Sequence, residues 1–79
     1  MLKKEDLYKG MKLKSTRDTF QTYDCIVEID MLLRKKGRVR VVEKGENSKD
    51  YIEVGDYKYF YYSNINGYKP LNSKIKRIS

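Results

Sequence analysis

Hydrophobic and polar residues alternate with a period of two along much of this chain, which is the pattern of strands that bury one face. In MKLKS (residues 11–15), Met11 and Leu13 fall on one face and the two lysines on the other. The longest alternating segment is TYDCIVEIDML (22–32), and its outer face is mostly acidic, as in an antiparallel sheet with one wet side. Its expected inner face consists of Tyr23, Cys25, Val27, Ile29 and Met31.

A second strand is expected directly after a basic turn. LRKKGR (33–38) contains Gly37, which is free to adopt positive φ in a turn. RVRVVEK (38–44) resumes the alternation, with Val39 and Val41 inward and the arginines outward. The pattern therefore predicts a β-hairpin over residues 22–44.

The next segments are shorter and less regular. KGENSKD (44–50) has the Gly, Asn and Ser content of a loop. DYIEV (50–54) predicts a short strand that places Ile52 and Val54 inward, and the following Gly-Asp pair breaks it.

The last third of the chain begins with YKYFYYSNI (57–65), which predicts another extended segment. Asn66-Gly67 suits a tight turn, and Pro70 stops a hydrogen-bonded ladder on its strand. SKIKRIS (73–79) is short and alternating, which predicts a final edge strand.

These elements predict a mostly β fold, namely a small five- or six-stranded antiparallel barrel or rolled sheet. At most one short helical turn fits, in KKEDLYKG (3–10) before Met11. A chain of 79 residues makes one domain, so residues 1–79 are expected to form a single small β domain. Closure is favoured because an open sheet of this size leaves exposed edges.

The order of the first elements resembles that of SH3-like small barrels of the KOW and Tudor kind. GMKLK forms the first strand, YDCIVEID is a longer second strand, and a basic turn leads into RVRVVEK. The resemblance covers about half of the chain and implies a fold only, so no functional residue is carried over from it.

The aromatic run YKYFYY (57–62) contains half of the ten aromatic residues of the chain. In a strand, Tyr57, Tyr59 and Tyr61 point to one face, and Lys58, Phe60 and Tyr62 to the other. One set completes the core and the other is left for a partner, and the run itself does not tell which. We take the set of Lys58, Phe60 and Tyr62 as the candidate binding face.

The residue types exclude much common chemistry. The chain has no His and a single Cys, Cys25, so it can build neither a Cys/His zinc site nor a His-based triad nor an intrachain disulfide. Cys25 lies in the apolar register and is expected to be a small buried hydrophobe. Asp24, Glu28 and Asp30 share a strand face, where pairing with cross-strand Lys and Arg accounts for them. We therefore expect no enzyme activity and no cofactor.

The net charge of +7 is concentrated toward the two ends of the chain, with a further basic cluster at the hairpin turn. In proteins that bind nucleic acid, basic clusters attract the phosphates and exposed aromatic rings beside them stack on the bases. The candidate residues for binding nucleic acid or another partner are Arg34, Lys35, Lys36, Arg38, Arg40, Lys58, Phe60, Tyr62, Lys69, Lys74, Lys76 and Arg77.

Two functions fit this pattern. One is a non-enzymatic basic protein that binds DNA or RNA. The other is an accessory or inhibitor protein that blocks a host protein, for example one of a defence system, since Tyr is also enriched at protein interfaces. A homodimer that pairs its aromatic face with itself is compatible with either.

The composition adds an expectation about origin and location. The chain has no Ala and is rich in Lys, Tyr and Ile, which indicates an AT-rich genome such as that of a low-GC bacterium, its phages or a mobile element. No apolar run approaches the roughly 20 residues that span a bilayer, and the first residues are charged where a signal peptide is apolar. We expect a cytoplasmic protein with no membrane partner.

Overall fold

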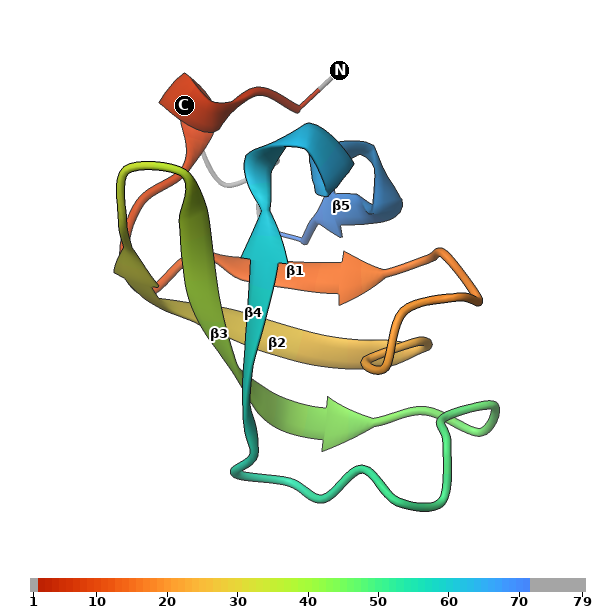
Figure 1. The fold of residues 1–79 in the computed structure, drawn as a ribbon. Coiled ribbons are helices and arrows are strands. Elements are labelled where there is room, and N and C mark those ends of the chain that lie inside the picture. The colour runs from red at the N-terminus through yellow and green to blue at the C-terminus, as the bar shows by residue number, and fades with distance from the viewer. Residues whose placement is uncertain (1, 72–79) are drawn as a thin grey trace, which may run out of the picture.

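A computed structural model describes residues 2–71 of the chain. Its strands form one antiparallel sheet (Figure 1). The strands, in the spatial order β4-β3-β2-β1-β5, are β1 (Lys12–Ser15), β2 (Cys25–Leu32), β3 (Lys36–Lys44), β4 (Tyr57–Tyr61) and β5 (Tyr68–Pro70). Two short 3-10 helices complete the described part, η1 (Lys4–Asp6) and η2 (Tyr62–Gly67). The prediction of a mostly β, five-stranded antiparallel fold is confirmed. Within residues 2–71 no ladder joins β4 to β5, so the sheet is open.

The alternation of apolar residues decides which face of the sheet is buried. Leu13, Val27, Val39 and Val41 have no exposed surface, as their register predicted. Cys25 is also fully buried, which confirms its expected place in the core. In Figure 1, β4 crosses in front of β1 and β2, and the ring of Phe60 on β4 contacts that of Tyr68 on β5, so the sheet curves around its buried side chains.

The hairpin of β2 and β3 is confirmed, with two departures from regular pairing. The register shifts between Ile26 and Val27 and again between Ile29 and Met31. A bulge changes the direction in which the following side chains point. After the second register shift Met31 is only half-buried, so the predicted inward position of Met31 is wrong.

Gly37 was expected to provide positive φ in the hairpin turn, and this is wrong. The turn closes through the Leu33 amide, which donates to the Lys36 carbonyl (2.8 Å), and Gly37 lies within β3 opposite Phe60. A Cβ at residue 37 would lie 2.7 Å from Cε1 of the Phe60 ring. The glycine is therefore needed for the close approach of this ring.

The strand predicted over residues 50–54 is absent, because the chain there runs as a series of turns. Ile52 is fully buried and serves as the one core contact of this connection, whereas Val54 is exposed. Gly55 has φ +99 and its amide donates to the Val41 carbonyl (2.7 Å), which turns the chain into β4. A loop can place a single apolar side chain in the core without joining the sheet.

The chain leaves the extended conformation earlier than predicted. β4 ends at Tyr61 and η2 replaces the expected extension to residue 65 and the Asn66-Gly67 turn. β5 then pairs with β1, with Leu13 opposite Pro70. The Leu71 amide still donates to the Lys12 carbonyl (3.1 Å), so the prediction that Pro70 stops the hydrogen-bonded ladder is wrong by one residue. The edge strand predicted over residues 73–79 lies outside the described residues.

Candidate binding surface

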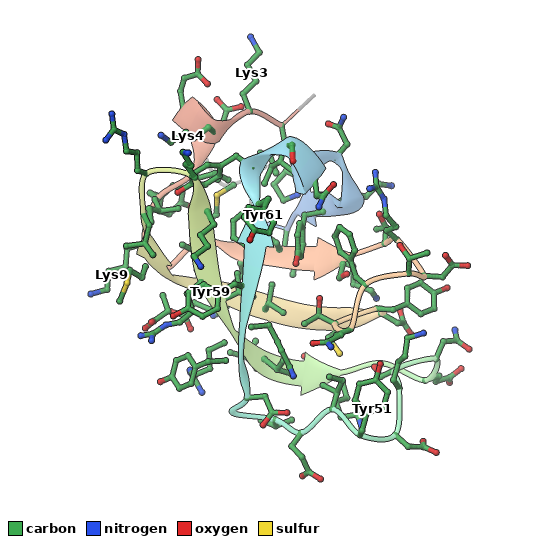
Figure 2. All side chains as sticks on the ribbon, viewed as in Figure 1. Lys3, Lys4, Lys9, Tyr51, Tyr59 and Tyr61 are labelled. Atoms are coloured by element: carbon green, nitrogen blue, oxygen red, sulfur yellow. The ribbon has the colours of Figure 1, made fainter. Side chains whose placement is uncertain are left out.

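The two faces of β4 have opposite environments. Phe60 is 5% exposed and packs in the core with Tyr68 at a ring distance of 5.3 Å. Tyr57, Tyr59 and Tyr61 are 52%, 55% and 57% exposed and lie on the outer face. Figure 2 shows Tyr59 and Tyr61 on the surface of β4. We call these three side chains the tyrosine row.

The candidate face chosen from the sequence is therefore the wrong one for Phe60, which is buried and has no access to a partner. Tyr62 lies in η2 and is half-buried against the core, with its ring edge-on to Phe60 (5.8 Å, 85°). Its hydroxyl donates to the Leu33 carbonyl oxygen (2.5 Å), and burial raises the pKa of this hydroxyl. Tyr62 thus holds the β2–β3 turn in place.

A row of cations borders the tyrosine row on the neighbouring strand. Outward-facing residues of β3 stand opposite the three tyrosines, in the pairs Lys36 with Tyr61, Arg38 with Tyr59 and Arg40 with Tyr57. We call the β3 residues the basic row. Two of them reach diagonally over a ring: the Lys36 Nζ lies 4.5 Å from the Tyr59 centroid and the Arg38 Cζ 4.6 Å from the Tyr57 centroid. These are cation–π contacts that keep both rings beside a positive charge.

Acidic residues of β2 orient the arginines of the basic row. Arg38 donates from Nε to Asp30 Oδ2 (2.7 Å) and from Nη2 to the same oxygen, and this pairing raises the pKa of Arg38. Arg40 Nη2 lies 3.7 Å from Glu28 Oε1. The predicted pairing of acidic residues with cross-strand cations is confirmed for Glu28 and Asp30, whereas Asp24 lies before β2 at φ +62 and pairs with Lys14 (3.1 Å). Part of each guanidinium fork stays available, since Arg carries five N–H donors.

The turn between β2 and β3 forms the basic end of this surface. Arg34 and Lys35 are exposed there, and two contacts tie their backbone to other elements. The Lys4 ammonium donates to the Arg34 carbonyl (3.3 Å) and lies 4.9 Å from the centroid of the Tyr62 ring, and the Tyr62 amide donates to the Lys35 carbonyl (3.5 Å). Lys4, which the sequence did not single out, therefore adds to the positive charge of this end.

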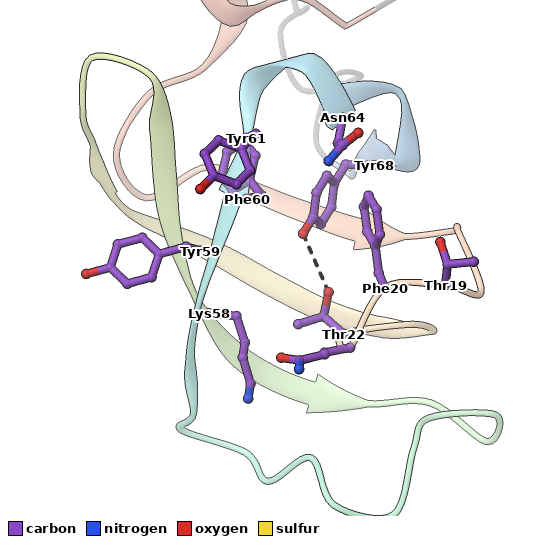
Figure 3. A pocket seen from close by; sticks show the side chains of 10 residues that line it. Thr19, Phe20, Thr22, Lys58, Tyr59, Phe60, Tyr61, Asn64 and Tyr68 are labelled. Atoms are coloured by element: carbon purple, nitrogen blue, oxygen red, sulfur yellow. Dashed lines mark hydrogen bonds between the residues drawn. The ribbon is translucent and has the colours of Figure 1, made fainter.

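The remaining predicted residues do not join this surface. Lys58 points to the opposite face of β4, into a cleft of about 210 Å³ that Thr22, Phe60 and Tyr68 also line (Figure 3). Lys69 is exposed on β5, beside Lys14 at the far edge of the sheet. The predicted residues Lys74, Lys76 and Arg77 lie outside the described residues.

The tyrosine row could have been selected from the sequence by its hydroxyl groups. One of the two sets of side chains contains Phe60, which has no polar atom. Every member of the other set, Tyr57, Tyr59 and Tyr61, carries a hydroxyl that can bond to water. The second signal is Gly37, whose missing side chain makes room for one large ring across the ladder. This second signal can be used only if the register of β3 against β4 is known, and the local sequence pattern does not give that register.

Among residues 2–71, no three Cys, Asp or Glu side chains gather as a metal-binding group. None of the helical segments in this same range has the length and apolar character required to cross a bilayer. Comparisons with models of protein families, with curated proteins and with solved structures find no match for this chain.

Proposed function

We propose that this protein is a non-enzymatic module that binds single-stranded nucleic acid on the outer face of β3 and β4. The observation that supports this proposal is the tyrosine row lying directly beside the basic row, with Lys36 and Arg38 over two of the rings. Proteins that bind single strands without sequence readout combine the same two components, aromatic rings for bases and cations for the backbone.

The spacing of the rings suits successive bases. Side chains at alternate positions of a strand are about 7 Å apart, which is roughly twice the 3.4 Å thickness of a stacked base. A base can therefore lie on each ring, or between two, without a change in the backbone. The basic row and the basic end at Arg34 and Lys35 then supply charge for the phosphates that follow the bases.

The acidic row of Glu28 and Asp30 is compatible with this binding mode. It holds Arg38 and Arg40 in fixed positions, so less side-chain freedom is lost when a phosphate binds. It also reduces the net positive charge of the face, so the salt dependence should reflect a small number of phosphate contacts.

We further propose that the rolled sheet is an SH3-like small barrel. The strand order supports this, because η2 alone connects the last residue of β4 with the first residue of β5 and so brings the two edges of the sheet toward each other. The contact of Phe60 with Tyr68 spans the same gap. The origin in a phage or mobile element of an AT-rich host is likewise a proposal, supported by composition alone.

A second candidate is a protein-binding accessory that blocks a host factor. The observation that favours it is the exposure of Leu32 and Leu33 at the basic end of the surface. Apolar side chains near tyrosines and arginines are typical of protein interfaces. The proposed contacts with bases and phosphates do not involve these two leucines.

Fluorescence anisotropy with single-stranded DNA and RNA, at low and at physiological salt, tests the main proposal. The matched variants replace Tyr57, Tyr59 and Tyr61 by Thr in one protein and Tyr51 by Thr in another. Tyr51 is 61% exposed and lies outside the surface, so it controls for the loss of an exposed tyrosine. The triple variant should lose about 1–3 kcal/mol of binding free energy per stacked base, while Tyr51→Thr should bind as the wild type does.

No binding by the wild type at low salt would contradict the proposal. Binding to double strands in preference to single strands, unaffected by the triple substitution, would contradict the role of the tyrosine row. Capture of one host protein that depends on Leu32 and Leu33, with no affinity for nucleic acid, would favour the second candidate.

A further inference from the structure

A cleft of about 210 Å³ opens beside β4, on the face opposite to the tyrosine row (Figure 3). Lys58 and Phe60 of β4 line one side of it, and Phe20, Thr22 and Tyr68 line the other. We call this space the side cleft. It is present with the ring contact of Phe60 and Tyr68 (5.3 Å) in place, so the proposed closure of the barrel leaves it open.

The side cleft has room for one ring system and has an aromatic wall. An apolar cavity of about 150 Å³ holds a benzene molecule, and pockets for drug-sized ligands begin at about 300 Å³. The rings of Phe20 and Tyr68 lie 5.2 Å apart at 44° and form the wall. Phe20 is packed against Gly67, where a Cβ would lie 2.6 Å from Cε2 of the ring. The wall is therefore in place before a planar ligand binds to it.

Buried hydroxyl groups also line the side cleft. Thr22 and Tyr68 are 2% and 5% exposed. The Thr22 hydroxyl donates to Ser15 Oγ (3.3 Å), whereas the Tyr68 hydroxyl lies 3.5 Å from Thr22 Oγ1, which is longer than a normal bond between hydroxyls. A buried hydroxyl without a close partner in the protein needs one from solvent or a ligand. Gln21 and Asn64 add side-chain amides, which carry both donors and acceptors.

The side cleft carries a positive charge. Lys58 lines it, and none of the described residues that line it is acidic. Among residues 2–71 no acidic side chain lies within ion-pair distance of the Lys58 ammonium. A second cation lies beside the aromatic wall, with the Arg17 Cζ 5.3 Å from the Phe20 centroid. These charges favour an anionic group in the side cleft and disfavour a cationic ligand.

We propose that the side cleft binds one nucleobase together with the phosphate on its sugar. The base would lie against Phe20 and Tyr68 with its polar edge toward the hydroxyls and amides, and the phosphate would lie beside Lys58. A free nucleotide and one unit of a strand present the same chemistry. Tyr59 and Tyr61 also line the side cleft, so a strand on the tyrosine row can turn one base into it, and this source of the base rests on the proposed function.

Two-dimensional NMR of the labelled full chain, titrated with the four ribonucleoside monophosphates, tests the proposal without a strand. We expect at least one nucleotide to shift the resonances of Thr22 and the side-chain amides of Gln21 and Asn64. Ribose phosphate, which lacks the base, should leave them unchanged. No shift with any nucleotide would overturn the proposal. Shifts confined to Tyr57 and Arg38 would also overturn it, because the base would then lie on the tyrosine row.

Two variants test the charge and the wall of the side cleft. Lys58→Gln should weaken binding of the nucleotide about tenfold, because the phosphate loses a charged partner. Lys44→Gln is the matched control, since Lys44 is exposed at the end of β3 and does not line the side cleft. Phe20→Leu keeps apolar volume and should weaken binding at least about threefold. Equal affinities of the two glutamine variants would overturn the role of Lys58 and with it the proposal.

Fluorescence anisotropy with a single-stranded oligonucleotide separates the two sources of the base. If Lys58→Gln also lowers the affinity for the strand, the side cleft takes a base of that strand, and if it does not, the ligand is the free nucleotide. A strand that binds while no nucleotide shifts the side cleft would overturn this inference and leave the proposed function standing. Nucleotides that bind in the side cleft while no strand binds would support it and contradict the proposed function.

Discussion

Both faces of β4 carry aromatic rings, and the two faces have opposite environments. On the inner face Phe60 packs between Gly37 and the ring of Tyr68, where its size and lack of polar atoms complete the core. On the outer face the tyrosine row is more than half exposed and is contacted by cations. The difference shows that one strand of five residues can supply both a core contact and an exposed aromatic row, because its side chains alternate.

The largest effect should follow from Phe60→Ala on the inner face. Truncating this buried ring should lower the free energy of unfolding by about 3–5 kcal/mol, because it removes apolar burial and leaves a cavity beside Gly37. Urea denaturation followed by circular dichroism measures it. The matched outer-face variant is Tyr59→Ala. Equal losses in the two variants would contradict the division of β4 into a core face and a binding face.

Gly37→Ala tests the same face from the opposite strand. The added Cβ would lie 2.7 Å from Cε1 and 2.8 Å from Cζ of Phe60, so the ring must move, and we expect a loss of about 1–3 kcal/mol. Combining it with Phe60→Leu should be less destabilising than the sum of the single substitutions, because the smaller side chain relieves the conflict. Additive losses would show that contact with Phe60 is not the reason for the glycine.

Tyr62→Phe tests the junction between the two faces. It removes the hydroxyl that donates to the Leu33 carbonyl and leaves the ring against Phe60, so a loss of about 0.5–1.5 kcal/mol is expected. Amide exchange should increase in residues 33–36 more than in β1. An unchanged exchange rate in the turn would mean that the Lys4 and main-chain contacts hold it without the hydroxyl.

The outer face should respond weakly in stability and strongly in binding. Tyr59→Thr removes an exposed ring and one cation–π contact with Lys36, so the free energy of unfolding should change by no more than about 1 kcal/mol. Its affinity for single-stranded DNA should nevertheless fall about tenfold. Thermal melts and anisotropy on the same preparation separate the two quantities. A loss of stability comparable to that of Phe60→Ala would contradict this prediction.

The smallest effect at neutral pH concerns Tyr68, the inner-face neighbour of Phe60. Burial raises the pKa of the Tyr68 hydroxyl, and a bond with Thr22 opposes this shift. Because the folded-state pKa is the higher one, the stabilisation is complete below the ordinary phenol pKa and is lost as pH rises through the folded pKa. Tyr68→Phe should therefore show a shallower fall of melting temperature in alkaline solution than the wild type. Identical alkaline slopes would contradict this prediction.

Local pattern in the sequence was sufficient for the first half of the sheet. β1, β2 and β3 follow from strict alternation, because each side chain on a strand has only two faces to choose from and one of them must be apolar. The burial of Cys25 follows from the same alternation, whereas Arg38 stands opposite Met31 and reaches Asp30 across a register shift. These features depend on neighbours along the strand or across one hairpin.

Tertiary structure decided the rest. Both faces of YKYFYY carry rings, so alternation alone could not choose between them, and the choice fell to the register with β3, where Gly37 accepts Phe60. Ile52 reached the core from a loop, since a single buried side chain needs no ladder. The candidate binding surface is likewise tertiary, because its cations and rings come from strands about twenty residues apart, and only their pairing places Arg38 over Tyr57.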